Sequence, residues 1–483
     1  MDVNSADRQA ALGDLRTLID LAGARGELRT IKGADPYLEM GALYELSLKK
    51  AKPPLLLFED IKGGPADRRI LMNMRFQTIF NSDLDLEALK RFRSVRNNSR
   101  ESVPPRIVAS GPITQNVLLG DDVDINLFPT GHWHEHDGGR YIGTEVVVIN
   151  KDPDTAWVNL GTYRVQVQDS KTLSVFIEPG KHGSLIREKW WARGEPCPMV
   201  ICVGQAPILG MVAGTSSSYG ASEYEAAGAR IGRPIDVVNG QLTGLPIPAD
   251  AEIAFEGFMP PPEEETRLEG PFAEWPGYYT TGAHPEPVVR VGAIYFRDNP
   301  IHTAQPPAKP TFPGRQPSLA GMAALWDALE RAGVPGVTGV WKPIGGGSRF
   351  INVISIKQLH QGHAKMAGLV ATGAGPGAYL GRITIVVDDD IDITDPAEIL
   401  WALATRWDPK TQTDIIDGCY SGHIDPVISP EKRAANDITS SRIIIYAVRP
   451  WAWKDQFPRV NMVDHTYALQ IANKWRGKLD FID

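Results

Sequence analysis

The sequence predicts a mixed α+β protein with two or three domains. Its 483 residues exceed the roughly 100–200 residues of a typical domain. Short β-rich runs separated by turn residues fill the middle of the chain, whereas strand and helix patterns alternate after residue 317. An apolar fraction of 42% provides enough side chains for several cores.

The first part of the chain, residues 1–105, predicts an α/β segment. Leucine and isoleucine recur on one stripe over residues 5–25, which favours a helix. A second helix is expected over residues 35–50, because that stretch opens with a capping Asp followed by Pro at the first helical position. Residues 55–58 then predict a buried strand.

Residues 106–317 predict a barrel or a sandwich with inserted helices. Strands are expected at 145–149, 157–167, 173–177, 199–203, 252–255 and 288–296, with turn residues between them. Helices are expected at 184–193 and 222–230. The proline-rich segment 305–317 is either a linker or an ordered loop at a domain junction.

Residues 318–483 predict an α/β domain of ordinary size. The expected elements alternate: strand 350–356, helix 364–371, strand 383–387, helix 396–405 and strand 441–448. Residues 464–478 predict a terminal helix.

Composition excludes several classes of protein. A net charge of -8, from 50 basic and 58 acidic residues, disfavours nucleic-acid binding. The three cysteines share no CxxC spacing, which argues against a disulfide scaffold and indicates a reducing, cytoplasmic location. The N-terminus lacks the apolar run of a signal peptide, and no apolar stretch reaches about 18 residues, so no membrane span is expected.

Two carboxylates, Glu269 and Glu274, flank a Gly-Pro pair in the sequence LEGPFAEWPGY. Gly-Pro interrupts a regular helix or strand, so this segment is expected to form a shaped loop. Such a loop can direct both carboxylates into one cavity, where their repulsion would keep one protonated and make it a proton donor. Taken alone, the same spacing also suits a solvated turn with two surface acids.

Asn159 and Arg164 lie five positions apart on the expected strand 157–167. Regular pleating would place them on opposite faces, but a bulge at Gly161 would bring them to one side. An arginine that faces a cleft can hold a carboxylate or a phosphate through two contacts. The alternative is an outward arginine on a half-exposed strand.

Two further segments have features of ligand sites. Lys181 and His182 stand at a glycine-bounded turn into a helix, whose free amides favour an anion, and His182 could bind a metal or act as a base. The small-residue loop AGTSSSYGAS lets backbone approach a ligand, and a cap at Ser222 would place Glu223 in the first helical turn. A structural histidine and a flexible surface loop are the alternatives.

Two other patterns are weaker. His132, His134 and His136 would share one face of a strand, but the surrounding proline and glycine residues favour a loop, which disfavours a metal site. Glycines 345–347 lack the lysine of a phosphate-binding loop and precede a strand instead of a helix.

Taken in order, four segments resemble the UbiD-type decarboxylases: Asn159 to Arg164, Lys181-His182, Ser222-Glu223, and Glu269 to Glu274. The resemblance extends over most of the chain. It implies a split β-barrel of the flavin-reductase type in residues 106–317. It also implies that the C-terminal α/β domain, residues 318–483, mediates a homodimer or a larger homo-oligomer, with the terminal helix reaching the partner.

The resemblance implies prenylated FMN as the cofactor, supplied by a separate flavin prenyltransferase. Asn159, His182 and Glu223 match the family's ligands for a divalent cation, Mn²⁺ or Mg²⁺, and their oxygen and imidazole donors suit such an ion. The loop around Ser216 resembles the part that holds a K⁺ ion, and Lys357 resembles a phosphate-contacting lysine. The implied cofactor-binding set is Asn159, Thr162, Arg164, Lys181, His182, Ser216, Glu223 and Lys357.

Arg164, Glu269 and Glu274 match the family's catalytic set. By resemblance, the cofactor is the electron sink of a reversible, non-oxidative decarboxylation. Glu274 protonates the product carbon, while Arg164 and Glu269 hold each other and orient the substrate carboxylate.

The sequence departs from the commonest family pattern near the expected site. Ala273 stands where many members have glycine, Trp275 follows the proton donor where a smaller residue is usual, and Lys181 adds a positive charge. A tryptophan narrows the pocket and favours a flat ring, so the expected substrate is an aromatic or heteroaromatic acid. The alternatives are a cinnamate-type acrylic acid, a non-catalytic flavin-binding subunit of a larger carboxylase, and a metal-dependent hydrolase built on the His132 cluster.

Overall fold

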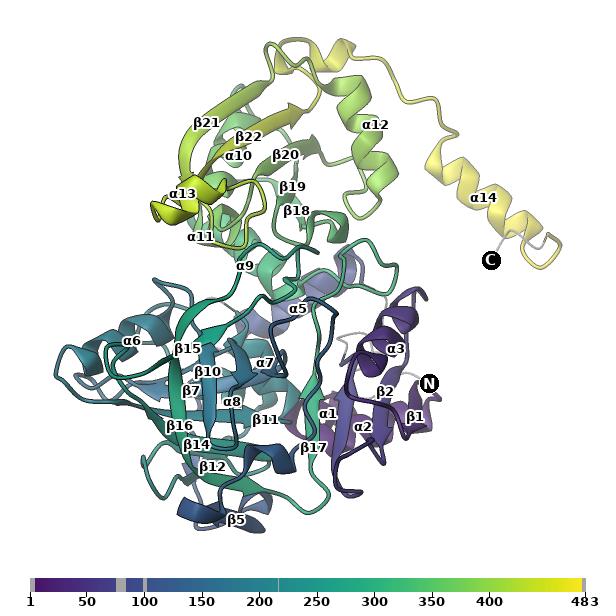
Figure 1. Cartoon of the computed structure of the whole chain (residues 1–483). Helices are drawn as coiled ribbons and strands as arrows, with labels where there is room; N and C mark the ends of the chain where they lie inside the picture. The colour runs from purple at the N-terminus through teal and green to yellow at the C-terminus, as the bar shows by residue number, and fades with distance from the viewer. Residues whose placement is uncertain (1–4, 75–83, 99–101, 216, 480–483) are drawn as a thin grey trace.

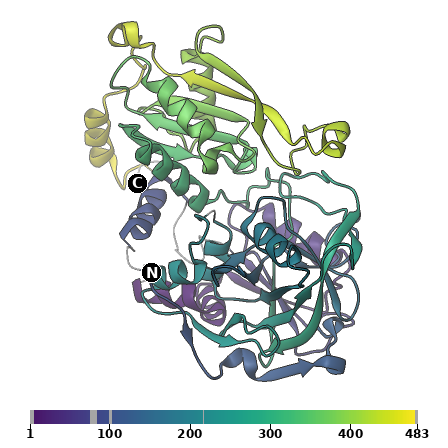
Figure 2. The same cartoon turned by 90° about the vertical axis from the view of Figure 1, so that its left-hand side faces the viewer.

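The computed structural model of the chain describes residues 5–74, 84–98, 102–215 and 217–479. The C-terminal residues form an upper body, and the N-terminal segment packs beside the middle part of the chain below it (Figure 1). The view turned by 90° shows the same two-level arrangement (Figure 2). The fold is of the mixed α+β class that the sequence predicts.

The expected first helix is two helices, α1 (Ser5–Gly13) and α2 (Leu15–Ala24). Asp14 separates them, because its backbone is extended and its side chain accepts the Thr17 amide to cap α2. The second expected helix begins four residues late, as α3 (Glu39–Leu48), because Leu38 before it has a φ of 63°.

The N-terminal sheet has the order β1-β2-β3-β17. Its strands are β1 (Leu28–Lys32), β2 (Leu55–Glu59), which was expected at 55–58, β3 (Arg69–Met72) and β17 (Ile301–Ala304). The last strand therefore comes from the end of the middle part, so the first segment completes its sheet with later residues. Helix α5 (Leu86–Asn98) leaves this segment and packs on the C-terminal core through Leu89.

The middle part is built around one ten-stranded sheet with the path β6-β9-β10-β16-β14-β11-β7-β8, to which β15 and β5 add by pairing with β16. Its strands are β5 (Asn116–Leu119), β6 (Tyr141–Gly143), β7 (Val146–Lys151), β8 (Val158–Gly161), β9 (Arg164–Val167), β10 (Thr172–Phe176), β11 (Cys197–Val203), β14 (Ile253–Met259), β15 (Thr266–Glu269) and β16 (His284–Phe296). A small sheet of β4 (Arg106–Ile107), β12 (Asp236–Asn239) and β13 (Pro246–Pro248) lies beside it. All six strand regions expected here contain strands.

The central strands of this sheet are buried on both faces, which agrees with the near-continuous apolar runs of β7 and β11. Along β7, Val147 and Ile149 join one apolar cluster, while Val146 and Val148 join another. Helices α7 (Pro207–Ala213) and α8 (Glu223–Ile231) contribute to the first cluster, and α6 (His182–Trp191) contributes Ile186 to the second. The sheet is thus a rigid support for loops at its ends.

The C-terminal domain is a five-stranded sheet of order β18-β19-β20-β22-β21, in which β19, β20 and β22 are parallel. Its elements are α9 (Leu319–Arg331), β18 (Val337–Trp341), β19 (Ile351–Ile356), α10 (His363–Gly373), α11 (Gly375–Ala378), β20 (Ile383–Asp388), α12 (Pro396–Arg406), β21 (Thr413–Tyr420), α13 (Pro430–Ala434) and β22 (Thr439–Ala447). The alternation expected from the sequence is confirmed. Helix α14 (His465–Trp475) follows an extended arm and stands away from the body (Figure 1).

Over the described residues, no helix combines the length and the apolar character needed to cross a membrane. All three cysteines are free.

Candidate active site

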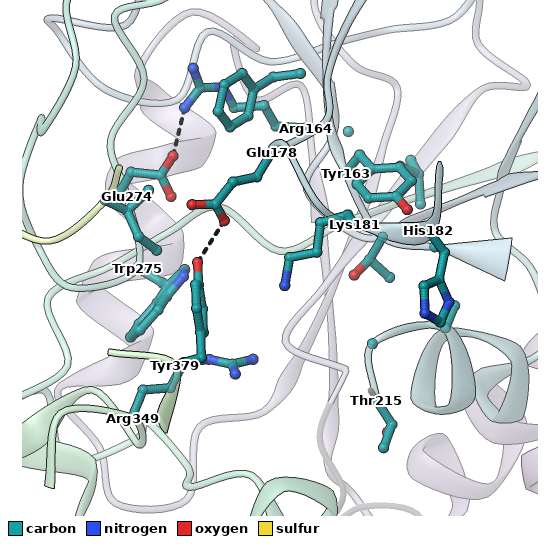
Figure 3. A pocket seen from close by; sticks show the side chains of 18 of the residues that line it. Tyr163, Arg164, Glu178, Lys181, His182, Thr215, Glu274, Trp275, Arg349 and Tyr379 are labelled. Atoms are coloured by element: carbon teal, nitrogen blue, oxygen red, sulfur yellow. Dashed lines mark hydrogen bonds and ion pairs between the residues drawn. The ribbon is translucent and has the colours of Figure 1, made fainter. Parts of the chain in front are cut away.

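A cavity of about 680 Å³ lies between the large sheet and the C-terminal domain. Its walls come from the β8–β9 corner, the start of α6, the loop after β15, and C-terminal residues that include Arg349 and Tyr379 (Figure 3). This volume falls within the usual range for small-molecule and cofactor sites.

The corner between β8 and β9 brings Asn159 and Arg164 to the same cavity. The expected single strand breaks at Thr162 and Tyr163, and its two halves pair with different neighbours. A Cβ at Gly161 would lie only 2.3 Å from the Tyr163 hydroxyl oxygen, so glycine is needed where the chain turns. The two side chains therefore share a side, which is one of the alternatives that the sequence left open, and they do so through a strand break instead of a bulge.

Arg164 stands between the two carboxylates. Its Nε and Nη2 donate to the two oxygens of Glu269 at 2.8 and 2.5 Å, and its Nη1 donates to Glu274 Oε1 at 2.6 Å. All three side chains are buried, with exposed fractions of 8%, 0% and 8%. Paired carboxylates at this spacing are therefore not surface acids here.

The pKa values of this triad are shifted by burial and by its own charges. Burial raises the pKa of Glu274 to about 7, although Arg164 acts in the opposite direction. Burial alone would lower the pKa of Arg164, but the two glutamates outweigh it and raise that pKa above its ordinary value. Glu274 can therefore hold a proton near neutral pH while Arg164 stays charged.

The loop that carries Glu274 is held by residues that the sequence did not single out as functional. Tyr141 donates from its hydroxyl to Glu269 Oε1 at 2.9 Å. Asp137 accepts the Ala273 amide at 3.1 Å and the Tyr279 hydroxyl at 3.2 Å. Asp137 directly follows the histidine-rich segment, and its hydrogen bonds connect the end of that segment to the loop that carries Glu274.

Asn159, His182 and Glu223, the predicted cation ligands, line the same cavity. Ser222 caps α8 as expected, and Glu223 is buried with an exposed fraction of 4%. Its carboxylate accepts the Leu160 amide at 3.1 Å and the Ser217 hydroxyl at 2.6 Å. No described residue forms an ion pair with it, and burial raises its pKa, so a bound cation would compensate its buried charge.

Two neighbours suit a cation at this place. The Asn159 amide donates to Asn150 Oδ1 at 3.0 Å, which fixes the orientation of its carboxamide. Burial, and then the charge of Lys181, lowers the pKa of His182, which favours the neutral imidazole that binds metals. The donor set of one amide, one imidazole and one carboxylate therefore fits a hard divalent ion.

The remaining predicted residues divide into three groups. Thr162 and Lys181 line the cavity together with Thr215. Ser216 lies outside the described residues. Lys357 is exposed just beyond β19 and is not part of the cavity wall, so this structure does not support a phosphate contact from it.

The histidine-rich segment is a loop, as expected, and its side chains diverge. His132 packs against Tyr37, with ring centroids 5.0 Å apart, while His134 faces Glu45 at 3.2 Å. Within the described ranges, no group of three His, Cys, Asp or Glu side chains is arranged to hold a metal ion.

The C-terminal domain closes the cavity through a contact that the sequence could not reveal. Glu178 accepts the Tyr379 hydroxyl at 2.8 Å and the His423 amide at 3.1 Å. Burial would raise the pKa of Glu178, but these hydrogen bonds, with that of the His423 ring, outweigh burial and lower it. Lys181 and Arg349 both lie over the Tyr379 ring, with Nζ and Cζ at 4.5 and 5.5 Å from its centroid.

The sequence matches three profiles of the 3-octaprenyl-4-hydroxybenzoate carboxy-lyase (UbiD) family. The N-terminal domain matches residues 19–76, the Rift-related domain 106–310, and the C-terminal domain 318–447. The chain therefore belongs to the UbiD family of carboxy-lyases.

Known relatives cover nearly the whole chain. Pyrrole-2-carboxylic acid decarboxylase of Pseudomonas aeruginosa is 32% identical over 465 residues, 90% of this chain and 91% of that protein. The UbiD-class enzyme HmfF of Pelotomaculum thermopropionicum, in complex with FMN, has a TM-score of 0.80 at 26% identity, with 94% of this chain and 98% of that one covered.

Two further structures extend the comparison. An evolved dimeric form of HmfF, solved with prFMN, has a TM-score of 0.77 at 26% identity, with 94% and 99% covered. The closed form of vanillic acid decarboxylase from Sedimentibacter hydroxybenzoicus has a TM-score of 0.82 at 26% identity, with 96% and 99% covered. The mixed α+β fold is thus that of UbiD-class enzymes.

Proposed function

We propose that this carboxy-lyase catalyses the reversible, non-oxidative decarboxylation of an aromatic or heteroaromatic acid with prenylated FMN. The observation that carries the proposal is the buried Arg164, held by Glu269 and Glu274 at the wall of the cavity. The reaction replaces a ring carboxylate with hydrogen and releases carbon dioxide, so it needs one proton at the carbon that loses the carboxylate.

Glu274 is the proposed source of that proton. Its Oε1 accepts from Arg164 at 2.6 Å, which leaves Oε2 to carry the proton. Glu269 keeps Arg164 in place through two contacts, and the third Arg164 nitrogen orients Glu274. Arg164 also stacks on Phe176, with Cζ 4.2 Å from the ring centroid, which restricts its movement.

The prenylated flavin, when bound, supplies the electron sink that the departing carboxylate needs. Asn159, His182 and Glu223 would hold its phosphate through Mn²⁺ or Mg²⁺, and the loop near Thr215 would hold K⁺. Thr162 and Lys181 line the same cavity and would contact the cofactor. A flavin prenyltransferase is the proposed supplier.

Trp275 favours a flat ring over a flexible chain as the substrate. It lines the cavity directly after Glu274, and its ring lies 6.1 Å from that of Phe350. A cinnamate-type acrylic acid is the second candidate substrate, since it too is flat. The intact Arg164, Glu269 and Glu274 set disfavours a non-catalytic subunit.

We also propose a division of the chain into three parts. We assign residues 1–105 to the segment that packs on the barrel, 106–317 to a split β-barrel for the cofactor, and 318–483 to dimerisation. The three free cysteines fit a reducing, cytoplasmic location. The exposed terminal helix suits a homodimer.

Co-production with a flavin prenyltransferase, followed by mass spectrometry of the released cofactor, tests the proposal. The expected cofactor is prenylated FMN in near-stoichiometric amount, and the loaded enzyme should release carbon dioxide from aromatic or heteroaromatic acids. Glu274→Gln should keep the cofactor and lose turnover. Retained turnover in that variant would exclude Glu274 as the proton donor. Plain FMN in the wild-type protein, with no turnover, would favour a non-catalytic flavin-binding subunit.

A further inference from the structure

The imidazole of His182, a predicted cation ligand, packs against two aromatic rings. Its centroid lies 5.3 Å from that of Trp157 and 5.4 Å from that of Tyr219, with interplanar angles of 71° and 87°. The Trp157 and Tyr219 rings also contact each other, with centroids 4.8 Å apart. The three rings therefore form one cluster with the edge-to-face geometry that aromatic pairs prefer.

Within the part of the chain that the structure describes, no hydrogen bond fixes the His182 ring. A metal-binding histidine normally donates from its second ring nitrogen to a carboxylate, a carbonyl or water, which sets the orientation of the ring. Here the contacts with two neighbouring rings restrict rotation of the imidazole instead. The orientation of His182 therefore depends on aromatic packing.

Trp157 also contacts the elements that carry the other two predicted ligands. It directly precedes β8, which contains Asn159. Its indole Nε1 donates to the carbonyl of Ala221 at 3.1 Å, in the loop just before Glu223. Trp157 thus connects the three elements whose side chains are predicted to bind the cation.

Tyr219 is anchored by hydrogen bonds, although 48% of it is exposed. Its hydroxyl donates to Asp152 Oδ2 at 2.8 Å, and Lys189 Nζ donates to the same oxygen at 2.6 Å. Lys189 lies on α6, the helix that begins at His182, so these hydrogen bonds join the loop to that helix. A ring this exposed contributes little to an apolar core, so its anchoring indicates a positioning role.

The anchored loop also carries groups of the cation site itself. Ser217, two positions before Tyr219, donates from its hydroxyl to Glu223 Oε1 at 2.6 Å. Thr215, at the start of the loop, lies on the same side of the cavity as His182 (Figure 3). Movement of Tyr219 would therefore disturb this side of the cavity through the loop as well as through the His182 ring.

We propose that Trp157 and Tyr219 are positioning residues for the divalent cation, because their rings hold the His182 imidazole in the orientation in which it binds Mn²⁺. This inference rests on the cation site of the proposed function and adds two residues to it. Neither residue belongs to the wall of the active-site cavity, so both act through His182 and not on the substrate.

Titration of the FMN-loaded chain with Mn²⁺ tests the role of Tyr219. Calorimetry measures the affinity, and electron spin-echo spectroscopy detects an imidazole nitrogen bound to Mn²⁺. Tyr219→Leu should weaken Mn²⁺ binding about 10- to 100-fold and reduce the imidazole signal. Tyr219→Phe keeps the ring and should bind Mn²⁺ at least about threefold more tightly than Tyr219→Leu; equal affinities of the two variants would overturn the role of the ring.

Trp157→Leu tests the second ring and should reduce the imidazole signal in the same way. An unchanged signal and affinity in either leucine variant would overturn the proposal for that residue. Thermal melting of each variant before titration verifies that the chain is folded, and the half-exposed Tyr219 provides the test that is least affected by loss of core packing.

Tyr37→Leu is the matched control. Tyr37 is an exposed tyrosine whose ring lies 5.0 Å from that of His132, a histidine outside the predicted ligand set. This variant should keep the wild-type affinity for Mn²⁺ and the full imidazole signal. Equal weakening by Tyr37→Leu and Tyr219→Leu would attribute the effect to general loss of packing and overturn the positioning role.

Carbon dioxide release separates this inference from the decarboxylase function. An imidazole signal that depends on Tyr219, in a chain that releases no carbon dioxide from any aromatic acid with prenylated FMN, would support the positioning role and refute the decarboxylase function. Wild-type protein whose bound Mn²⁺ gives no imidazole signal would refute His182 as a ligand, and this inference with it, whatever its turnover.

Discussion

At the residue scale, Arg164 has one positive charge and two carboxylate partners. With both glutamates ionised, this buried group has an excess negative charge, and uptake of one proton restores neutrality. Burial directs that proton to Glu274, whose pKa it raises to about 7. The protonated form is the donor, so we expect kcat to fall as the pH rises through about 7.

The pH profile of kcat, measured with cofactor-loaded enzyme below and above pH 7, tests whether kcat falls as the pH rises. Glu274→Asp should keep a descending limb, because it retains a carboxyl group, whereas Glu274→Gln should have no activity to titrate. A kcat that increases with pH over the same range would mean that the ionised carboxylate is the active form.

Tyr141 is a positioning residue for the same group. Its hydroxyl donates to Glu269 at 2.9 Å, and burial, with the charge of Glu269, raises its pKa so that it remains a donor. Tyr141→Phe should lower kcat about fivefold with little change in KM, since removal of one such hydrogen bond costs about 1 kcal/mol.

The matched control for Tyr141 is Tyr446→Phe. Tyr446 donates to Asp414 in the C-terminal domain, so its loss should affect thermal stability but not kcat. A similar fall in kcat in both variants would attribute the Tyr141 effect to general destabilisation.

At the scale of elements, β-rich runs between turn residues predicted seven of the ten strands of the large sheet and missed the short strands β5, β6 and β15. The predicted element boundaries were wrong where a contact of a single side chain determines the local backbone conformation. Asp14 divides a continuous helical stripe by capping α2, and the close contact of Gly161 with Tyr163 divides a continuous strand pattern. Neither effect is visible in periodicity, since each depends on a contact between specific atoms.

The start of α6 depends on a similar contact. A Cβ at Gly183 would lie 2.7 Å from the Tyr163 hydroxyl oxygen, and Gly161 closes on that hydroxyl as well, so Tyr163 cannot move aside. Gly183→Ala should therefore displace the first turn of α6, which carries His182, and lower the affinity of the proposed cation site for Mn²⁺ about tenfold or more. Metal analysis and flavin content per chain measure the effect.

Gly373→Ala is the control for that substitution. Gly373 ends α10, and an added Cβ there would meet no atom within 4 Å. This variant should keep full metal and flavin content and gain a few tenths of a kcal/mol in stability. Full Mn²⁺ affinity in Gly183→Ala would show that the Tyr163 contact does not position His182.

At the scale of the whole molecule, the order of motifs predicted which residues of the middle part face the cavity, but not what the C-terminal domain adds to it. Tyr379 reaches Glu178 across 201 positions of sequence, and Arg349 enters the same wall. Such contacts depend on how two domains dock, which no local pattern encodes. Lys357 illustrates the limit: a lysine chosen by resemblance is exposed, while Arg349, eight positions earlier, lies at the site.

The last prediction concerns self-association through the C-terminal arm. Helix α14 and the arm before it expose Met462 (81%), Val463 (64%), Tyr467 (56%) and Leu469 (50%), and the helix lies apart from the body (Figure 1). Apolar side chains grouped in this way mark an interaction surface, and a second copy of the chain is the proposed partner.

Truncation after Gln456 should therefore convert a dimer into a monomer in analytical ultracentrifugation. Leu469→Arg in the full chain should weaken association by at least about tenfold, because a buried apolar contact becomes a charge. Leu242→Arg, at an exposed leucine of the middle part, should have no effect. The active-site cavity lies within one chain, so the monomeric variant should retain the cofactor; a truncated protein that remains dimeric would place the interface on the domain's sheet or helices instead of on this arm.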